Sequence, residues 1–505
     1  MKVLSAAQIR EADKQTILNE PITSLNLMER AATKCSSWIT EKLPESKNYI
    51  VICGPGNNGG DGLAIARMLW HYQKSVTVYY CNINQVFSVD FSSNKIRLEK
   101  ETDIKPTELN ENNQTILFEE NAVIIDCILG SGLNRKTEGW ISDLIKELNQ
   151  LNTLKISIDI PSGLFADDTN HINGDEVIFK ADYTLTFELP KLSLLLPEGI
   201  YYAGELIILS IGLDYQYINK AESSFFFIQE DSARQLIKKR PITGHKGTFG
   251  HAYLICGSAG FAGAAALCSK AAIKSGCGLV TTETALDNDV CILNYAPEIM
   301  VQTGDKRSYP SQINPPAKTS AIGIGPGIGN SKETNSLLKL LLNKWNGPLV
   351  LDADALNVIA DDPTLLSFIP TGSILTPHPG EFDRLFNLKN PLGIERLRKQ
   401  IEMSTKYSIY ILLKGYRTSI SSPKGRVYFN STGNNGMATA GCGDVLTGII
   451  TSLVAQGYYP LEACILGTYI HGLSGDIALN EQSEESLTAS ELINNLGKAF
   501  KKLKA

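Results

Sequence analysis

Two glycine-rich runs in this 505-residue chain carry the residue types that bind phosphate and other anions. The first is Gly54-Pro-Gly-Asn-Asn-Gly-Gly-Asp-Gly62, and the second is Ala440-Gly-Cys-Gly-Asp444. Glycines let backbone amides approach a ligand closely, and the amides at a helix start carry the positive end of its dipole. Because the two runs are unrelated, the sequence predicts two sites that perform two coupled reactions.

The first run matches the G-x-G-x-x-G pattern, between a strand and a helix, that is typical of dinucleotide binding. The usual binding mode also needs a carboxylate at the end of the next strand, where it holds the ribose hydroxyls. That strand ends with Tyr80-Cys81-Asn82 and carries no acid there. Hydride transfer with a conventionally bound nicotinamide is therefore not supported, although the amides before the helix can still hold an anion.

Oxygen ligands with little formal charge gather at one predicted edge of the first half. Asn58 lies in the glycine-rich run, Asp126 ends a predicted strand, and Ser162 follows another. Ligands of open α/β sheets bind beyond the carboxyl ends of the strands, so these side chains are predicted to converge. Their chemistry suits a weakly bound monovalent cation better than zinc or magnesium.

Asp159 and Lys191 are the acid and base candidates of this half. Asp159 ends one predicted strand, and Lys191 follows Glu188 at the end of the next. Alternatively, Asp126 and Asp159 only cap the helices that follow them, which is the commoner role of a single Asp at a strand end. Four polar strand ends aimed at one edge favour a site.

Asp444 is the candidate general base of the second half. It lies in the first turn of an apolar helix predicted to reach residue 454. Successive amides there would form an anion hole, and Asp444 could take a proton from a hydroxyl that attacks a phosphate. Alternatively, Asp444 is a first-turn acid that only complements the helix dipole. Glycine at both 441 and 443 fits an approaching ligand better than a plain cap.

Three further loops, at 323–329, 376–381 and 414–418, each follow a predicted strand of the second half and support a site there. His378 lies between two prolines, so its ring is held rigidly and can contact a ligand, although a lone histidine is more often structural. Asp352 and Asp354 are interpreted as helix-start residues or as residues behind the site.

Short apolar strands alternate with helical patterns along the whole chain, which is typical of parallel α/β layers. Helices are predicted at 61–72 and 140–149, and periodicity is lost over 214–222, which places a domain boundary near 215–228. Strands are predicted at 49–53, 75–80, 122–127, 155–160, 183–187 and 205–210, and then at 224–228, 251–256, 278–282, 319–324, 348–351, 373–375 and 409–413.

Length and composition narrow the classes of protein. A chain of 505 residues implies about two to four domains. The net charge of −6, with acids and bases interspersed, leaves no basic tract for a nucleic acid partner. The chain has no apolar signal segment or membrane-spanning run, so we expect a cytoplasmic protein without a membrane partner. The ten cysteines include no C-x-x-C pair, which predicts buried thiols rather than disulfides or zinc ligands.

Residues 1–215 resemble the epimerase domain that acts on damaged, hydrated nicotinamide cofactors. The resemblance rests on the first glycine-rich run, on the stretches 125–133 and 158–164, and on 7–13 and 28–32. It implies that Asn58, Asp126 and Ser162 hold potassium. The residues that would contact the hydrated cofactor are Asn57, Asn58, Gly59, Gly60, Asp61, Gly130, Ser131, Gly132, Leu133, Asn134, Arg135, Lys136 and Asp159. The same fold also occurs as a non-catalytic scaffold in RNA-decay proteins.

Residues 225–505 resemble the ribokinase-like family and, within it, the nucleotide-dependent dehydratase that repairs the same hydrated cofactors. The run at 244–250, the glycines at 257 and 263 and the loops described above carry this resemblance. The residues that would contact the hydrated nicotinamide are Gly263, Ala264, Gly327, His378 and Asp444. Those that would hold the adenine nucleotide are Lys414, Gly415, Tyr416, Arg417, Thr418 and Gly443. Cys442 replaces the alanine usual in the family, and its oxidation would block the anion hole.

Together the resemblances imply an α/β chain with a Rossmann-like three-layer parallel-sheet domain at 1–220 and a ribokinase-like α/β domain at 221–505. They imply a bifunctional enzyme. The first domain would interconvert the R and S forms of hydrated NADH or NADPH, with Asp159 and Lys191 assisting proton transfer. The second would dehydrate the S form at the expense of ADP, giving AMP and phosphate, with Asp444 as the base.

The implied cofactors are potassium and ADP as co-substrate, with ATP as an alternative nucleotide and Mg²⁺ accompanying it. The resemblance alone implies a homo-oligomer, and the long apolar helices predicted at 444–454 and 464–479 are candidates to bury subunit contacts. A small-molecule kinase with an N-terminal binding or scaffold domain is the competing interpretation. It would use the same loop at 441–444 but leaves the first domain unexplained, and a pure scaffold does not need that domain's polar set.

Overall fold

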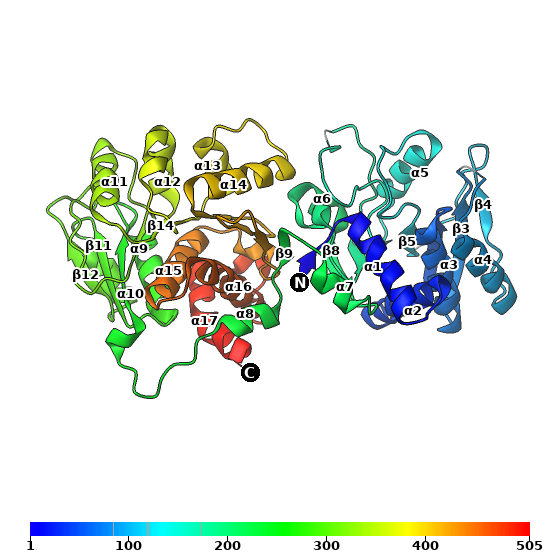
Figure 1. Cartoon of the computed structure of the whole chain (residues 1–505), viewed down its shortest axis with the longest axis horizontal. Helices are drawn as coiled ribbons and strands as arrows, with labels where there is room; N and C mark the ends of the chain where they lie inside the picture. The colour runs from blue at the N-terminus through cyan, green and yellow to red at the C-terminus, as the bar shows by residue number, and fades with distance from the viewer. Residues whose placement is uncertain (84, 119–120, 173, 505) are drawn as a thin grey trace. The chain divides into compact units, whose positions relative to one another are not determined.

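The computed structural model describes residues 1–83, 85–118, 121–172 and 174–504. The chain divides into two compact units (Figure 1). The N-terminal unit comprises Lys2–Ser223 and Leu392–Ile394. The C-terminal unit comprises Met1, Ser224–Pro391 and Glu395–Ala505. Each unit is built on its own largely parallel sheet.

The sheet of the N-terminal unit has the order β4-β3-β2-β5-β6-β7-β8, and all its neighbouring strands run parallel. Its strands are β2 (Asn48–Cys53), β3 (Ser75–Cys81), β4 (Thr107–Leu109), β5 (Val123–Cys127), β6 (Lys155–Ile158), β7 (Tyr183–Phe187) and β8 (Glu205–Leu209). The helices, which follow the short strand β1 (Lys2–Val3), are α1 (Ala6–Asn19), α2 (Ser24–Lys42), α3 (Asn57–His71), α4 (Val89–Glu101), α5 (Gly139–Gln150), α6 (Pro197–Ala203) and α7 (Tyr215–Lys220).

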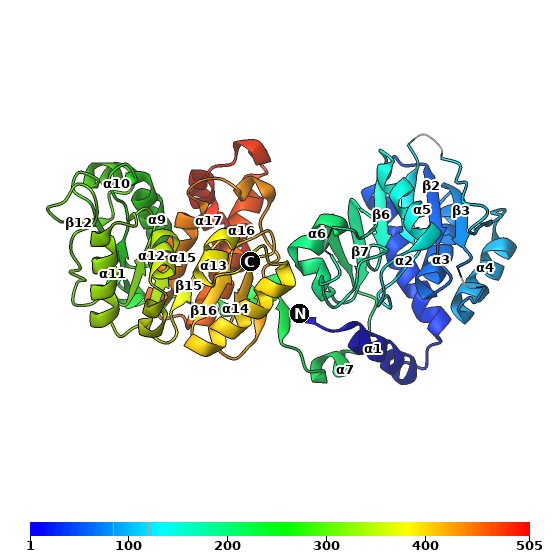
Figure 2. The same ribbon diagram turned by 90° about the horizontal axis from the view of Figure 1, so that it is seen from above.

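Helices cover both faces of this sheet, so the predicted three-layer arrangement is confirmed (Figure 2). Alternate residues of β2 point to opposite faces: Val51 packs in one core with Leu63 of α3, and Ile52 packs in the other with Leu144 of α5. Because α3 follows β2 and α5 follows β5, the winding direction reverses between these neighbouring strands. Ligands of open α/β sheets bind at such a switch point.

The sheet of the C-terminal unit has the order β9-β18-β17-β16-β15-β14-β13-β10-β11-β12, with β17 antiparallel to both neighbours. Its strands are β9 (Phe225–Phe227), β10 (His251–Ile255), β11 (Leu279–Thr284), β12 (Met300–Thr303), β13 (Ala321–Ile324), β14 (Leu349–Leu351), β15 (Ile374–Leu375), β16 (Tyr410–Leu413), β17 (Ser419–Ser421) and β18 (Val427–Phe429). The helices are α8 (Glu230–Leu236), α9 (Ala262–Lys274), α10 (Asp289–Tyr295), α11 (Lys332–Lys344), α12 (Ala353–Asp361), α13 (Pro379–Leu385), α14 (Gly393–Tyr407), α15 (Cys442–Ala455), α16 (Pro460–Ala478) and α17 (Ala489–Lys504).

This sheet also lies between two helical layers (Figure 1). Leu338 of α11, Leu356 of α12 and Phe382 of α13 share one core, while α15, α16 and α17 pack in another. Nearly every residue of α15 and α16 is buried within the unit. The idea that these helices supply subunit contacts is therefore wrong: their apolar surface is used by the unit's own core.

The predicted strands agree with the observed ones to within about two residues, but five short strands were missed: β1, β4, β12, β17 and β18. The helix predicted to begin at Asp61 begins at Asn57, because the glycine run itself adopts helical geometry after Gly56. Nine cysteines are buried, as predicted, and Cys291 is exposed. Within the described residues, no helix is long and apolar enough to cross a membrane.

Candidate active sites

Asp126 lies at the carboxyl end of β5, completely buried, and organises the switch point of the N-terminal unit. Its carboxylate accepts hydrogen bonds from the Ser157 hydroxyl (2.7 Å), the Ser162 hydroxyl (2.5 Å), the Ser162 amide (2.9 Å) and the Ile128 amide (3.1 Å). Burial raises the pKa of Asp126, and these hydrogen bonds oppose the rise. Asp126 and Ser162 therefore meet, as predicted, and they hold the 128–130 loop in place.

Asn58 brings an unsatisfied oxygen to the same place. Its side-chain nitrogen donates to the Leu129 carbonyl at 3.1 Å, while its Oδ1 is buried and has no hydrogen-bond partner among the described residues. The Ser162 hydroxyl lies 3.3 Å from the same carbonyl. An orphaned buried oxygen is costly unless a donor or a cation reaches it. The three predicted cation ligands are thus gathered around Leu129.

Asp159 and Lys191 form a direct ion pair beyond the ends of β6 and β7. Lys191 is 1% exposed and also donates to the Thr186 hydroxyl at 2.8 Å, so its ammonium is held at one point. Asp159 has a φ of +66°, an unfavourable conformation for a residue with a side chain. The two residues predicted as acid and base therefore lie in direct contact. The helix-cap alternative for Asp159 does not account for this contact.

Two further carboxyls share this charge environment, and sequence reasoning gave no catalytic role to either. Burial, with a smaller contribution from Asp159, raises the pKa of Asp13 to about 6. Burial is the main reason that the pKa of Asp61 lies well above its usual range, and the negative charges of Asp159 and Asp13 raise it further. Asp13 lies on α1, which also brings Arg10 within about 4 Å of the position a Gly132 side chain would occupy. The opening stretch 7–13 was noticed only through the family resemblance.

The remaining predicted cofactor contacts lie on two segments around the switch point. Gly59 and Gly60 are in the first turn of α3, where an added methyl group at Gly59 would overlap the Gly54 carbonyl. They are therefore required for close packing whatever they bind. Asn57 is exposed at the helix start. The other segment is the loop after β5, which is partly or fully exposed and contains Gly130, Ser131, Gly132, Leu133, Asn134, Arg135 and Lys136.

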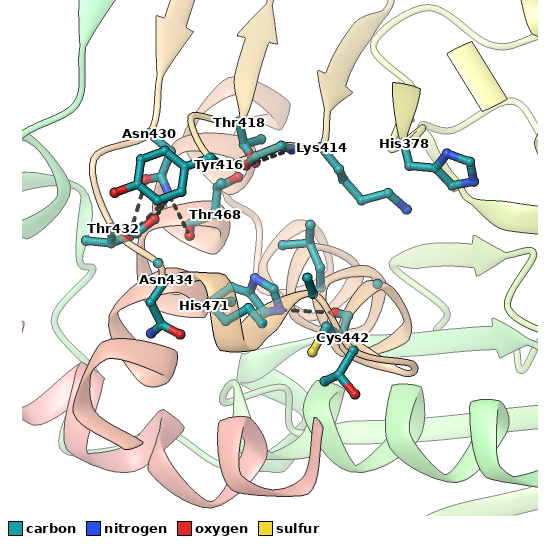
Figure 3. Close-up of a pocket in the computed structure, with 18 of the residues that line it drawn as sticks. His378, Lys414, Tyr416, Thr418, Asn430, Thr432, Asn434, Cys442, Thr468 and His471 are labelled. Carbon is teal, nitrogen blue, oxygen red and sulfur yellow. Dashed lines mark hydrogen bonds between the residues drawn. The ribbon is translucent and has the colours of Figure 1, made fainter. Parts of the chain in front are cut away.

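The C-terminal unit contains a cavity of about 630 Å³, a volume that fits a nucleotide or cofactor (Figure 3). It lies between the ends of β14, β16 and β18 and the starts of α13 and α15. The predicted residues that line it are His378, Lys414, Gly415, Tyr416, Thr418, Gly443 and Asp444. Arg417 is not among the lining residues, because its guanidinium donates to the Ser431 carbonyl at 2.8 Å.

Gly263, Ala264 and Gly327 are also outside the lining of this cavity. They lie together near the start of α9, where a side chain on Gly327 would come within 3.2 Å of the Ala264 Cβ. Gly327 has a φ of +62°, which a residue with a side chain adopts only at a cost. The structure thus places these predicted contacts beside one another but does not include them in the cavity lining with the other seven.

Asp444 is a half-buried acid at the start of α15, and the nearby Lys414 is paired with a different carboxylate. The Lys414 ammonium donates to Asp352 at 2.8 Å and lies 3.9 Å from Glu381. Burial raises the pKa of Asp444 to about 7, and the charge of Asp352 adds to the rise. A carboxyl with a pKa near neutrality can accept a proton under ordinary conditions, so the geometry suits a general base.

Of the two alternatives for Asp352, a helix-start residue or a residue behind the site, the second describes its side-chain contacts. It is 1% exposed, makes no capping bond to α12, and accepts from both Lys414 and the Thr447 hydroxyl (2.7 Å). Burial tends to lower the pKa of Lys414, but Asp352 and Glu381 outweigh it and raise that pKa. Asp354 instead accepts from the Gly329 amide at 2.8 Å and so holds the 323–329 loop.

The start of α15 is shaped for an anion. Gly441 has a φ of +90°, and a side chain on Gly443 would come within 3.3 Å of the Lys414 ammonium. The absence of a side chain at Gly443 therefore leaves the ammonium next to the helix amides. His378 caps α13 by accepting from the Gly380 amide (3.1 Å), and its ring is half exposed at the cavity edge (Figure 3). His378 thus has a structural role and also borders the cavity.

Sequence reasoning missed a polar wall of the cavity, made by Asn430, Thr432, Asn434, Thr468 and His471 (Figure 3). Asn430 donates to the Thr432 carbonyl at 2.9 Å, and the Thr432 hydroxyl donates to the Tyr469 carbonyl at 2.8 Å. The Oδ1 of Asn434 is buried without a partner among the described residues. Only the Asn434-Asn435 pair before the second glycine run gave a signal of this wall.

The folds and sites together define a class: an α/β enzyme with a carboxylate–lysine pair at a Rossmann-like switch point and a helix-start carboxyl in the cavity of a ribokinase-like unit. Residues 24–193 match the family model described as the YjeF-related protein N-terminus, and residues 252–498 match the model described as NAD(P)H-hydrate dehydratase. The chain belongs to the family of bifunctional NAD(P)H-hydrate repair enzymes.

Full-length relatives carry both units. The chain is 34% identical to the bifunctional NAD(P)H-hydrate repair enzyme Nnr of Thermofilum pendens, over 100% of this chain and 97% of the relative. It is 31% identical to the bifunctional NAD(P)H-hydrate repair enzyme Nnr of Escherichia coli, over 97% of this chain and 92% of the relative. The ADP/ATP-dependent NAD(P)H-hydrate dehydratase of Bacillus subtilis, co-crystallised with ATP and Mg²⁺, superposes with a TM-score of 0.50 and 30% identity over 55% of this chain and 98% of its own. The kinase interpretation is not favoured.

Proposed function

We propose that the domain at residues 1–220 interconverts the R and S forms of hydrated NADH and NADPH, and that the domain at 221–505 dehydrates the S form with ADP. The observation that carries the second step is the half-buried Asp444, which lines the same cavity as Lys414. Burial raises the pKa of Asp444 to about 7. A base near neutrality, an anion hole and an ammonium are the parts that phosphoryl transfer needs.

In the dehydration, Asp444 takes the proton of the C6 hydroxyl, and the oxygen attacks the terminal phosphorus of ADP. A new O–P bond forms, the bond to the bridging oxygen breaks, and AMP leaves. The ring nitrogen then expels phosphate from C6, and loss of the C5 proton restores the dihydropyridine. Lys414 and Gly443 would stabilise the phosphates, with Gly415, Tyr416 and Thr418 holding the nucleotide. Mg²⁺ would enter with the nucleotide.

The hydrated nicotinamide would lie against Gly263, Ala264, Gly327 and His378. The support is geometric: Gly327 packs against the start of α9 beside Ala264, and His378 borders the cavity that contains Asp444. In the epimerase domain, Asp159 and Lys191 would move the proton during reversible loss and return of the C6 hydroxyl. Their ion pair beyond the ends of neighbouring strands supports this role.

The epimerase substrate would lie across the switch point. Its contacts would be Asn57, Asn58, Gly59, Gly60, Asp61, Gly130, Ser131, Gly132, Leu133, Asn134, Arg135, Lys136 and Asp159. The amides of the first turn of α3 favour the pyrophosphate of the cofactor. The exposed loop after β5 borders this turn, since a side chain on Gly130 would come within 3.1 Å of the Asn58 Cβ.

Potassium would be held by Asn58, Asp126 and Ser162. The residues fit it, because the orphaned Oδ1 of Asn58 lacks the donor or cation that a buried oxygen needs. The ion would supply positive charge that holds the 128–130 loop. Potassium, compared with choline at equal ionic strength, should raise the thermal midpoint of the wild type, and Asn58→Ala should lose that response. Equal midpoints of the wild type in the two salts would reject the site.

The test of the whole function follows the absorbance of the reduced nicotinamide ring with a mixture of both hydrate epimers and ADP, ATP or no nucleotide. Full recovery that depends on nucleotide is expected, with ADP the faster. Recovery that stops when the S form is consumed would remove the epimerase assignment. No recovery with either nucleotide would reject repair and favour the kinase. We also propose a homo-oligomer on the family resemblance, and light scattering of the purified chain would test it. The cytoplasmic location expected from the sequence stays a proposal.

A further inference from the structure

A second cavity, of about 390 Å³, lies in the C-terminal unit and takes no part in either proposed reaction. The segment 237–249 and the carboxyl ends of α9, α15 and α17 form its walls. Five basic side chains line it, and none of the described lining residues is acidic: Lys238, Lys239, Arg240, Lys274 and Lys504. A chain whose net charge is −6 thus concentrates positive charge at one hollow.

Two of these cations have a structural role. Lys238 donates to the Gly457 carbonyl at 2.5 Å, and the Arg240 guanidinium donates to the Gly276 carbonyl. These carbonyls follow α15 and α9, where the helix dipoles are negative. The same cations lie over aromatic rings, with Lys238 4.4 Å from the Tyr458 centroid. Helix capping therefore explains Lys238 and Arg240.

The other three cations are not explained in this way. Lys239, Lys274 and Lys504 are exposed, and within the described residues none has a hydrogen-bond or ion-pair partner. Three uncompensated charges around one hollow repel one another unless an anion binds between them. Phe500 adds apolar surface to the same walls, and so does Phe249, whose ring centroid lies 4.0 Å from the Arg240 guanidinium. The cavity thus combines the two features that recognise a phosphate attached to an aromatic ring.

We propose that this basic cavity is a second anion site that binds a nucleotide, with its phosphates at Lys239, Lys274 and Lys504 and its base against the aromatic walls. The site also gives a role to the 244–250 run, part of which (Thr248 and Phe249) forms its wall, and which neither reaction site uses. The volume suits a mononucleotide.

The basic cavity is separate from the reaction cavity. Asp444 is in the first turn of α15, whereas Leu453 and Gln456 at the other end of that helix line the basic cavity. A helix of 14 residues is about 21 Å long. The two sites can therefore be occupied and mutated independently.

Equilibrium dialysis of the full chain with ADP tests the proposal, using Lys239→Glu/Lys274→Glu as the cavity variant. The matched control is Lys318→Glu/Lys424→Glu, which reverses two exposed lysines elsewhere in the unit. We expect two equivalents of ADP on the wild type and the control, and one on the cavity variant, whose second affinity falls at least tenfold. Pyrophosphate should bind the cavity more weakly than ADP, and equal binding would overturn the role of the aromatic walls.

The stoichiometries separate this proposal from the proposed function. One equivalent on both wild type and cavity variant overturns the basic cavity as a nucleotide site. One equivalent on the wild type that the cavity variant loses supports the basic cavity and counts against ADP in the reaction cavity. No ADP bound to the wild type overturns both assignments.

Discussion

The two units differ in which carboxylate the lysine of each site is paired with. At the switch point of the N-terminal unit, Lys191 is paired directly with Asp159, and the neighbouring acids Asp13 and Asp61 have raised pKa values. In the C-terminal unit, Lys414 is paired with Asp352 rather than with Asp444, whose pKa rises to about 7. The choice of partner decides which carboxyl is left to accept a proton.

This difference teaches that a lysine near a catalytic acid need not activate it. A bound ammonium stabilises the ionised form of its partner and makes that partner a weaker base. In the C-terminal unit Lys414 is tied to a second, buried carboxylate, and the pKa of Asp444 stays raised to about 7. The N-terminal unit instead pairs its lysine directly with Asp159.

The largest expected effect is that of Asp444→Asn, which removes the base while keeping the shape of the site. Dehydratase kcat with the pure S form should fall by roughly 10²–10⁴-fold with little change in substrate affinity, and epimerisation should be unchanged. Phosphate release measures the first activity. The control is Asp361→Asn, an exposed acid at the end of α12. Wild-type kcat in the Asp444→Asn variant would remove the base assignment.

Asp159→Asn should break the other pair and leave the dehydratase intact. Asn tolerates the positive φ at this position, so the backbone is retained, while the proton partner of Lys191 is lost. Epimerisation should slow by roughly 10²-fold, and the thermal midpoint should fall because Lys191 is left buried without its counter-ion. The exposed control is Asp143→Asn. Normal interconversion of R and S forms by the Asp159 variant would contradict the role.

Asp352→Asn sharpens the comparison through pH. In the wild type, Asp444 must be ionised to act, so dehydratase kcat/KM should fall as the pH drops below about 7. Removing Asp352 deletes a charge that raises this pKa and frees Lys414 to pair with Asp444, and both changes lower it. The acid limb should move to lower pH, and the plateau rate should fall by roughly tenfold because the base is weaker. An unshifted limb would show that Asp352 does not tune Asp444.

The smallest effect is expected from Cys442→Ala. Cys442 is the first residue of α15 and borders the cavity, and burial raises the pKa of its thiol to about 11, so the reactive thiolate is scarce at neutral pH. Stability should fall by about 1 kcal/mol and activity should stay within twofold. Peroxide should inactivate the wild type no faster than the alanine variant. Faster loss in the wild type would instead restore the expectation that oxidation of Cys442 blocks the anion hole.

The strand ends and glycine runs were readable from the sequence because each is a local pattern. Asn58, Asp126, Ser162 and Asp159 all follow apolar strands, and parallel strands bring their carboxyl ends to one edge. The polar wall around Asn430 and His471 was not readable, because its members come from segments about 40 residues apart that carry no shared pattern. The sequence placed Asp352 at a helix start or behind the site but did not identify its partner, because Lys414 is 62 residues away.

The sequence by itself determined the α/β class, the positions of most strands and the family, since these depend on local periodicity and on short motifs. Only the tertiary structure decided that Lys191 binds Asp159 while Lys414 binds Asp352, and that Arg417 turns away from the cavity that Lys414 and Tyr416 line. The physical reason is that pairing and burial depend on distances between segments remote in the chain. Those distances set the local electric field, and the field sets which acid gives or takes a proton.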